Sequence, residues 1–126
     1  MKIASGINDY YIPSSFPTLI DLKITDYMSD TSRIILFLQN TSNLRRLHIT
    51  LASKLINGRE WEQIICNYLQ KLKVFQVRMK DKSDNIQEQA NELVNSFRNS
   101  FWIDEHKWFI RCITIGNTIH LDSLSK

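Results

Sequence analysis

The residues with the greatest capacity for chemistry are three consecutive titratable side chains, Asp104, Glu105 and His106. Two carboxylates and an imidazole are groups that bind divalent metals or transfer protons. Consecutive residues of one short segment cannot all face a single ion, and no second histidine or cysteine stands at ligand spacing. We therefore expect a solvated loop or a helix cap. The alternative is a small metal-dependent or hydrolase-like enzyme centred on residues 104–106.

The other reactive side chains are scattered along the chain. His48 and His120 each alternate with apolar neighbours, as in a half-exposed strand, and neither has a nucleophile at catalytic spacing. Cys66 and Cys112 lie within apolar runs, so we expect free, buried and inert thiols, which fits a reducing compartment. With 3 glycines, the chain contains no phosphate-binding glycine loop and no nucleophile elbow. We therefore predict a protein that is not an enzyme, with no catalytic residue, no metal site and no cofactor.

The composition predicts one globular domain. The chain has 126 residues, of which 43% are hydrophobic and 23% charged, and this excludes wholesale disorder. The net charge is only +3, and no basic run exceeds Arg45–Arg46, so we expect no nucleic-acid partner. Residues 1–10 lack the apolar run of a signal peptide, and no apolar stretch of about 18 residues occurs. We therefore expect no membrane partner and an intracellular location, cytoplasmic or nuclear.

An internal repeat is the most informative pattern. Three segments, 19–24, 44–49 and 72–77, each carry apolar residues at positions 1, 4 and 6. Their starts lie 25 and then 28 residues apart, which matches the period of leucine-rich repeats with their L-x-x-L-x-L core. Positions 4 and 6 have the two-residue period of a strand. The repeat therefore predicts three short strands that lie side by side in parallel.

Parallel neighbours need crossover connections, and the connections have helical patterns. Residues 29–40 predict a first helix, with Ser29 or Asp30 as its N-cap. Asn57 and Glu60 form a capping-box pattern before an apolar stripe at helical spacing, which predicts a second helix. A third helix is expected to begin near Asp84 and to bury Ile86, Ala90, Leu93, Val94 and Phe97.

The repeat breaks after Phe97. An aromatic-rich connection is followed by two predicted strands, Trp108–Ile115 and Thr118–Leu124, which Gly116 and Asn117 join as a type II′ turn. Trp102 and Trp108 are expected to cover the open end of the sheet, and the alternative is an exposed aromatic anchor for a partner. We divide the chain into a lead-in or remnant of a preceding repeat (1–15), leucine-rich-repeat-like strand–helix units (16–100), and an aromatic connection with a β-hairpin cap (101–126).

The repeat and the aromatic connection together resemble a known family. The matching segments are Asn43–Ile49, Ile56–Ile65, Leu72–Phe75, Asn95–Arg98 and Phe101–Phe109. They resemble the C-terminal region of certain invertebrate F-box proteins with leucine-rich-repeat-like tails, over about residues 16–124. The run from Asn95 to Phe109 is the most specific part, because the L-x-x-L-x-L core recurs widely.

The resemblance implies an adaptor in ubiquitin-dependent degradation. In that family the F-box recruits a Skp1–cullin ubiquitin-ligase core, and the repeat tail presents a target to it. The sequence before Phe16 supplies no F-box, so this core is an expected partner only if an F-box is encoded upstream. Tyr27, Ala52 and Lys80 replace the asparagine that many leucine-rich repeats carry at position 9, so the repeats are irregular.

These patterns predict an α/β fold: a short irregular leucine-rich-repeat solenoid with a parallel sheet, helices on one side and a C-terminal β-hairpin cap. Outward strand residues would line a concave face. We expect this face to bind an acidic segment of a protein target, and the alternatives are an ordinary solvated face or a structural remnant of a longer solenoid with no independent function. The predicted contact residues are Asp21, Lys23, Arg46, His48, Thr50, Gln76 and Arg78.

Overall fold

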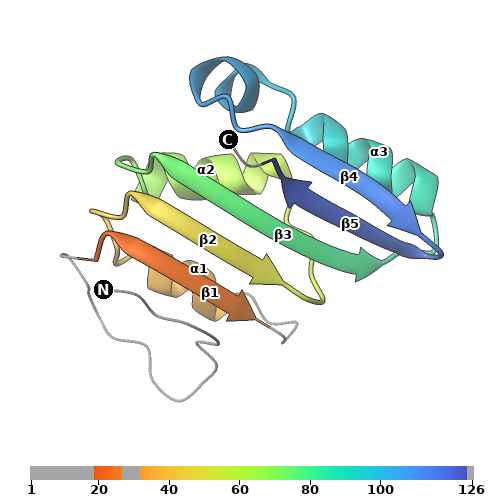
Figure 1. Cartoon of the computed structure of the whole chain (residues 1–126), viewed down its shortest axis with the longest axis horizontal. Helices are drawn as coiled ribbons and strands as arrows, with labels where there is room; N and C mark the ends of the chain where they lie inside the picture. Colours follow the sequence, from red (N-terminus) through yellow and green to blue (C-terminus); the bar gives the residue numbers. More distant parts are fainter. Residues whose placement is uncertain (1–18, 27–31, 125–126) are drawn as a thin grey trace.

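A computed structural model describes residues 19–26 and 32–124 of the chain (Figure 1). The predicted lead-in at 1–15 and both cap candidates of the first helix, Ser29 and Asp30, lie outside these residues. The elements, in chain order, are β1 (Asp21–Asp26), α1 (Ser32–Leu38), β2 (Arg46–Leu51), α2 (Gly58–Tyr68), β3 (Val74–Lys82), α3 (Ile86–Ser96), the π-helical turn η1 (Phe101–Glu105), β4 (Ile110–Ile115) and β5 (Thr118–Ser123).

The three repeat segments form adjacent parallel strands, as predicted. Position 4 of each repeat is in register, with Leu22 beside Leu47 and Leu47 beside Phe75. Position 6 is aligned in the same way across β1, β2 and β3. Position 1 is buried in all three repeats. One repeat pattern therefore fixes both the register of the three strands and the side of the sheet that enters the core.

The prediction of a purely parallel sheet with a separate hairpin cap is wrong. The sheet has five strands in the order β1-β2-β3-β5-β4, and β5 pairs antiparallel with β3. The physical reason is that β2 occupies only one edge of β3, which leaves the opposite edge free, and β3 has 9 residues where β1 and β2 have 6. Its C-terminal half offers a free edge, and β5 joins that edge while burying Ile119 and Leu121. The fold is therefore α/β with a mixed, open five-stranded sheet.

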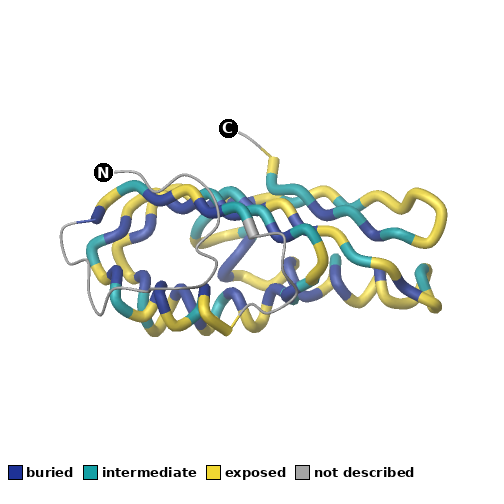
Figure 2. The backbone as a smooth tube through the Cα atoms, turned by 90° about the horizontal axis from the view of Figure 1, so that it is seen from below, coloured by how far each residue is buried: buried dark blue, intermediate teal, exposed yellow. Residues whose placement is uncertain are grey.

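All three α-helices lie on one face of the sheet (Figure 2). The core lies between the two layers and contains apolar inward residues of β1, β2, β3 and β5, whereas Ile110 and Cys112 of β4 are only partly buried. Side chains alternate along each strand, so the outward residues form a second face that no described helix covers. The predicted one-sided placement of the helices is confirmed, and it leaves this second face open.

The predicted helix signals are confirmed in the described residues. The Glu60 N–H donates to the Asn57 side chain over 2.9 Å, so Asn57 caps α2. Of the residues predicted to be buried in the third helix, Ala90, Leu93 and Phe97 are buried, whereas Ile86 and Val94 are only half-buried. The first helix is shorter than expected in its described part, which begins at Ser32 and ends at Leu38.

The aromatic connection is part of the core. The His106 N–H donates to the Phe101 carbonyl over 3.2 Å, which closes the π-helical turn η1. Trp102 and Trp108 are buried, and the centres of their rings lie 5.6 and 5.7 Å from the ring centre of Phe75. The alternative of an exposed tryptophan anchor is therefore wrong, because both indoles pack against β3 from the helix side.

The hairpin turn has the predicted geometry. Gly116 has a φ of 61° and Asn117 has no positive φ, as a type II′ turn requires.

Among the described residues, no helix is long and apolar enough to cross a membrane.

Candidate binding face of the sheet

The structure brings all seven predicted contact residues onto the open face of the sheet. Lys23, His48 and Gln76 stand side by side across β1, β2 and β3. Asp21 lies beside Arg46 in the row before them, and Thr50 lies beside Arg78 in the row after them. The two-residue period of the strands explains this grouping, because in-register strands align their outward residues in rows. We call the outward residues of β1 to β5 the open face.

Two shallow hollows on the open face divide the predicted residues. The first has a volume of about 260 Å³ and is lined by the outward residues Asp21, Lys23, Arg46, His48, Val74 and Gln76. The second, of about 350 Å³, is lined by the outward residues Thr50, Arg78, Lys80, His120 and Asp122. The seven residues therefore belong to one continuous face but do not converge on one point. Such a surface suits an extended ligand better than a small molecule.

Sequence reasoning missed the part of the open face that the hairpin completes. Lys80 and Lys82 belong to the extension of β3, while His120 and Asp122 come from β5 and Arg111 from β4. They share the face because β5 places His120 beside Lys80 and Asp122 beside Arg78. The alternation of polar and apolar residues in both hairpin strands was a usable signal, but it does not indicate which strand the hairpin pairs with.

The open face is strongly basic. It carries six cationic side chains and two carboxylates. Neither carboxylate is free: the Asp21 carboxylate lies 3.3 Å from the Arg46 guanidinium, and Asp122 is shared between two arginines. The cations are Lys23, Arg46, Arg78, Lys80, Lys82 and Arg111.

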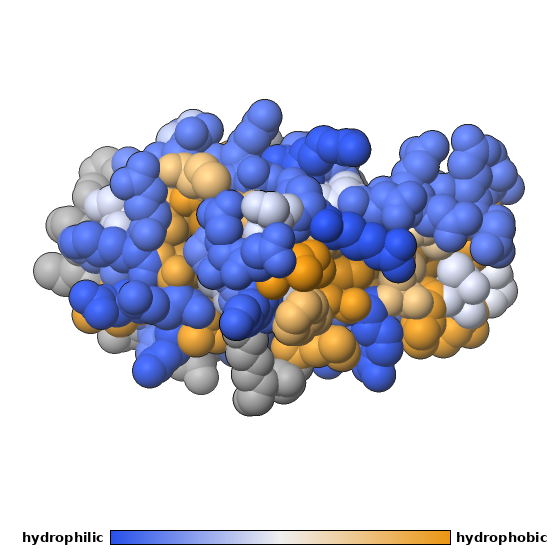
Figure 3. Space-filling view, turned by 90° about the horizontal axis from the view of Figure 1, so that it is seen from above, coloured by the Kyte–Doolittle hydropathy of each residue, from blue (hydrophilic) through white to orange (hydrophobic). Residues whose placement is uncertain are grey.

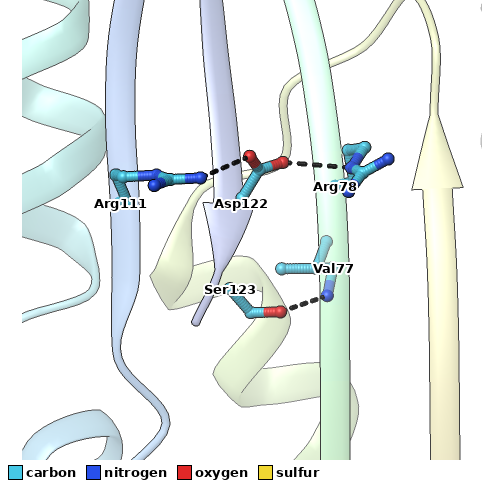
Figure 4. A network of polar contacts seen from close by, with 5 residues as sticks. All are labelled: Val77, Arg78, Arg111, Asp122 and Ser123. Atoms are coloured by element: carbon cyan, nitrogen blue, oxygen red, sulfur yellow. Dashed lines mark hydrogen bonds and ion pairs between the residues drawn. The ribbon is translucent and has the colours of Figure 1, made fainter. Parts of the chain in front are cut away.

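Asp122 ties three strands together at the centre of this charge (Figure 4). Its carboxylate accepts from Arg78 on β3 at 3.2 Å and lies 3.5 Å from the Arg111 guanidinium on β4. Next to it, the Ser123 hydroxyl accepts from the Val77 N–H over 2.9 Å. The arginines remain exposed, at 71% and 62% of their side-chain surface, so they are held in place yet open to an anion. Exposed ion pairs of this kind contribute about 0–1 kcal/mol to stability, so the network orients charge more than it holds the fold.

The lysines of the open face, in contrast to its arginines, form no ion pairs with carboxylates of the described residues. Within the described ranges, no carboxylate lies within ion-pair distance of Lys23, Lys80 or Lys82. Lys80 and Lys82 are two positions apart along β3, which is a distance of about 6.6 Å. The face therefore presents unneutralised positive charge at the repeat distance of an extended chain.

The side chains of residues 104–106, the alternative enzymatic centre, are not arranged around a common point as the ligands of a metal ion would be. Asp104 and Glu105 are exposed, and the ring of His106 stacks on Trp108 with centres 4.0 Å apart and planes 13° apart. The Ser100 hydroxyl lies 3.4 Å from the Glu105 carboxylate. In residues 19–26 and 32–124, no group of three or more His, Cys, Asp or Glu side chains is placed to hold a metal ion.

The prediction of two buried cysteines is wrong for Cys66, which is exposed, while Cys112 is half-buried. Both are free thiols. Desolvation raises the pKa of the Cys66 thiol, and the nearby charges of Glu62 and Glu105 raise it further. Burial alone raises the pKa of the Cys112 thiol. Neither cysteine is therefore an activated nucleophile, since activation requires a lowered pKa.

Comparisons with known proteins add no family to this description. No family model matches the chain, and neither the curated proteins nor the solved structures contain a significant match.

Proposed function

We propose that this protein is a non-enzymatic interaction module whose open face binds an acidic, extended segment of a partner protein. The observation that carries the proposal is the excess of exposed cations on a sheet face that no described helix covers. Charge complementarity of this kind steers a partner to its site and selects against partners of the wrong sign. The two hollows are shallow and β3 lines both of them, which fits a segment that lies along this strand.

The spacing of the cations supports an extended ligand. In an extended peptide every second side chain points the same way, about 6.6 Å from the last. Arg78, Lys80 and Lys82 repeat at this distance along β3. A segment with acidic residues at alternate positions therefore matches three cations at once, and each contact with a fixed guanidinium is a charge-assisted hydrogen bond.

The finer fold assignment belongs to the same proposal. We interpret the three strand–helix units as irregular leucine-rich repeats of an F-box protein tail. The in-register repeat positions and the helical crossovers support this interpretation, as does the resemblance over residues 16–124. If an F-box is encoded upstream, the longer protein would bring the acidic partner to a Skp1–cullin core, and sequencing the gene upstream of Met1 tests this part.

Reversing the charge of the open face is expected to weaken binding of an acidic peptide by at least about tenfold. The probe is a fluorescent peptide of alternating Glu and Ser, titrated by fluorescence anisotropy. The variants are Arg46→Glu with Arg78→Glu and, separately, Lys80→Glu with Lys82→Glu. Because all four side chains are exposed, the thermal midpoint should stay nearly unchanged.

Matched controls separate a specific face from net charge. Arg33→Glu with Arg59→Glu changes the charge equally on exposed residues of α1 and α2, and it should leave binding within about twofold of the wild type. A peptide of alternating Gln and Ser should not bind. Equal loss in both sets of variants would refute a specific face. Tighter binding of a single-stranded DNA oligomer than of the acidic peptide would redirect the function to nucleic acid.

A further inference from the structure

The sheet ends at β4, and this edge carries exposed apolar side chains. Phe109 is 43% exposed, Ile113 45% and Ile115 61%. Figure 3, which views the molecule from the side of β4 and α3, shows hydrophobic surface gathered in the centre and at the right of the view, beside hydrophilic surface. No described element covers the outer side of β4. The edge therefore combines open strand backbone with a hydrophobic border.

The hairpin determines which backbone groups point outward. The Leu124 N–H donates to the Phe109 carbonyl over 2.8 Å, and a two-residue turn joins Ile115 to Thr118. Residues 109, 111, 113 and 115 therefore direct their backbone groups toward β5. Because these directions alternate along a strand, the N–H and C=O groups of Ile110, Cys112 and Thr114 point away from the sheet.

This edge lacks the features that keep sheet edges apart. Such edges are normally protected by lysine, proline, a bulge or a covering segment. β4 has the sequence Ile-Arg-Cys-Ile-Thr-Ile, without lysine or proline, and it pairs with β5 in continuous register. Its single charge, Arg111, is bound to Asp122 of β5. The edge is therefore suited to pair with another strand.

We propose that two copies of this chain pair antiparallel through β4, about a twofold axis at Cys112. A twofold axis perpendicular to the sheet must pair residues that point to the same face. With Cys112 on the axis, Ile110 lies opposite Thr114 of the second copy, so every outward backbone group of the strand has a partner. The neighbouring register, with Ile113 on the axis, would place Ile110 opposite the turn residue Gly116 and lose these bonds.

The side chains are complementary to themselves in this register. Phe109 lies opposite Ile115 of the second copy, so two exposed apolar side chains bury each other. Arg111 lies opposite Ile113 and not opposite its own copy, which avoids direct repulsion between like charges across the strands. The axis is perpendicular to the sheet, so both basic open faces lie on the same side of the pair. A second copy therefore provides hydrogen-bond partners for the outward backbone groups, covers exposed apolar side chains and places no like charges directly opposite each other.

Two substitutions test the edge directly. Ile113→Lys adds a protecting charge, and Thr114→Pro removes an outward N–H without breaking the β4–β5 pairing. Light scattering after size exclusion, over about a hundredfold range of concentration, should show the wild type shifting from one copy to two, as mass action requires. Both variants should keep the mass of one copy throughout. Leu36→Lys, at a side chain of α1 that is 53% exposed, should behave as wild type.

Oxidation tests the register. Directly opposed residues in hydrogen-bonded pairs have Cα atoms about 5.5 Å apart, which a disulfide can bridge. In Cys66→Ser, an added oxidant at alkaline pH should take two electrons from two Cys112 thiols, release two protons and form a covalent pair. The double variant Cys66→Ser with Cys112→Ser should form none. A mass of one copy at every concentration would overturn the proposal, as would a pair that survives both edge variants or fails to cross-link through Cys112.

Discussion

Replacing Gly58 with alanine is expected to lower the free energy of unfolding by about 3 kcal/mol. Gly58 begins α2, and its Cα lies against the C-terminal end of α3. A Cβ at this position would overlap the Ser96 carbonyl oxygen and approach the Ser96 carbonyl carbon to 2.6 Å. Both atoms belong to the backbone, so no side-chain rotation relieves the overlap.

The sign of this effect is the opposite of the usual one. Alanine for glycine in a helix ordinarily stabilises by about 0.5–1 kcal/mol, because glycine loses more backbone freedom on folding. Here the Gly58 N–H donates to the Ser96 hydroxyl over 2.7 Å, and that hydroxyl donates to the Leu93 carbonyl over 2.6 Å. Alanine must push α2 away from α3 and stretch this buried chain of hydrogen bonds. The clash therefore outweighs the gain in helix propensity.

Chemical denaturation monitored by circular dichroism measures this loss. Gly116→Ala is the matched control, since Gly116 has a φ of 61° and no atom within 4 Å of the added Cβ. This control loses only the freedom of glycine to adopt the left-handed backbone, which costs about 1 kcal/mol. If Gly58→Ala were as stable as the wild type, or no worse than Gly116→Ala, the close contact between α2 and α3 would be refuted.

Gly58 also marks a limit of sequence reasoning. The segment that begins at Asn57 is correctly predicted as a helix start, because capping depends on residues within one turn. The reason for glycine at the next position is Ser96, which lies 38 residues away. A contact of that kind has no local periodicity, so the sequence alone does not indicate it.

For the candidate binding face too, the sequence predicts the features that depend on nearby residues and misses those that depend on the whole fold. The seven predicted residues share one face because strand alternation and the repeat period are both local properties. The turn residues also predict the hairpin, yet they do not predict its place beside β3. That place depends on which sheet edge is free after the repeat strands have paired, which is a property of the whole fold. His120 and Asp122 were therefore missed, although both lie in a predicted hairpin strand, and Lys80 was missed because β3 continues to Lys82, beyond the predicted segment 72–77.

Cys66 illustrates an error of a different origin. Its apolar neighbours Ile64 and Ile65 suggest a buried run. In α2 these two isoleucines face the sheet, and the next residue lies a further 100° or so around the helix, beyond the apolar stripe. Helical periodicity, applied to each residue and not to the run, would have placed Cys66 at the surface.

Replacing Trp102 with alanine is expected to cost about 4 kcal/mol of stability, more than the loss expected for Gly58→Ala. Trp102 is fully buried in η1, and its ring lies 4.8 Å from that of Phe97 and 5.0 Å from that of Phe101, centre to centre. Its indole N–H donates to the Gly58 carbonyl over 3.2 Å. The side chain thus joins η1, the end of α3 and the start of α2 under β3. Removing it leaves a large cavity and breaks a buried hydrogen bond.

Trp61 provides the comparison that separates packing from hydrogen bonding. It is also fully buried, but its indole N–H has no hydrogen-bond partner among the described residues. Trp61→Phe therefore loses ring volume alone, whereas Trp102→Phe also loses the bond to the Gly58 carbonyl. We expect Trp102→Phe to be the more destabilising by about 1–2 kcal/mol in denaturant titrations. Equal losses would mean that the bond to Gly58 adds nothing, and that Trp102 stabilises the junction through packing alone.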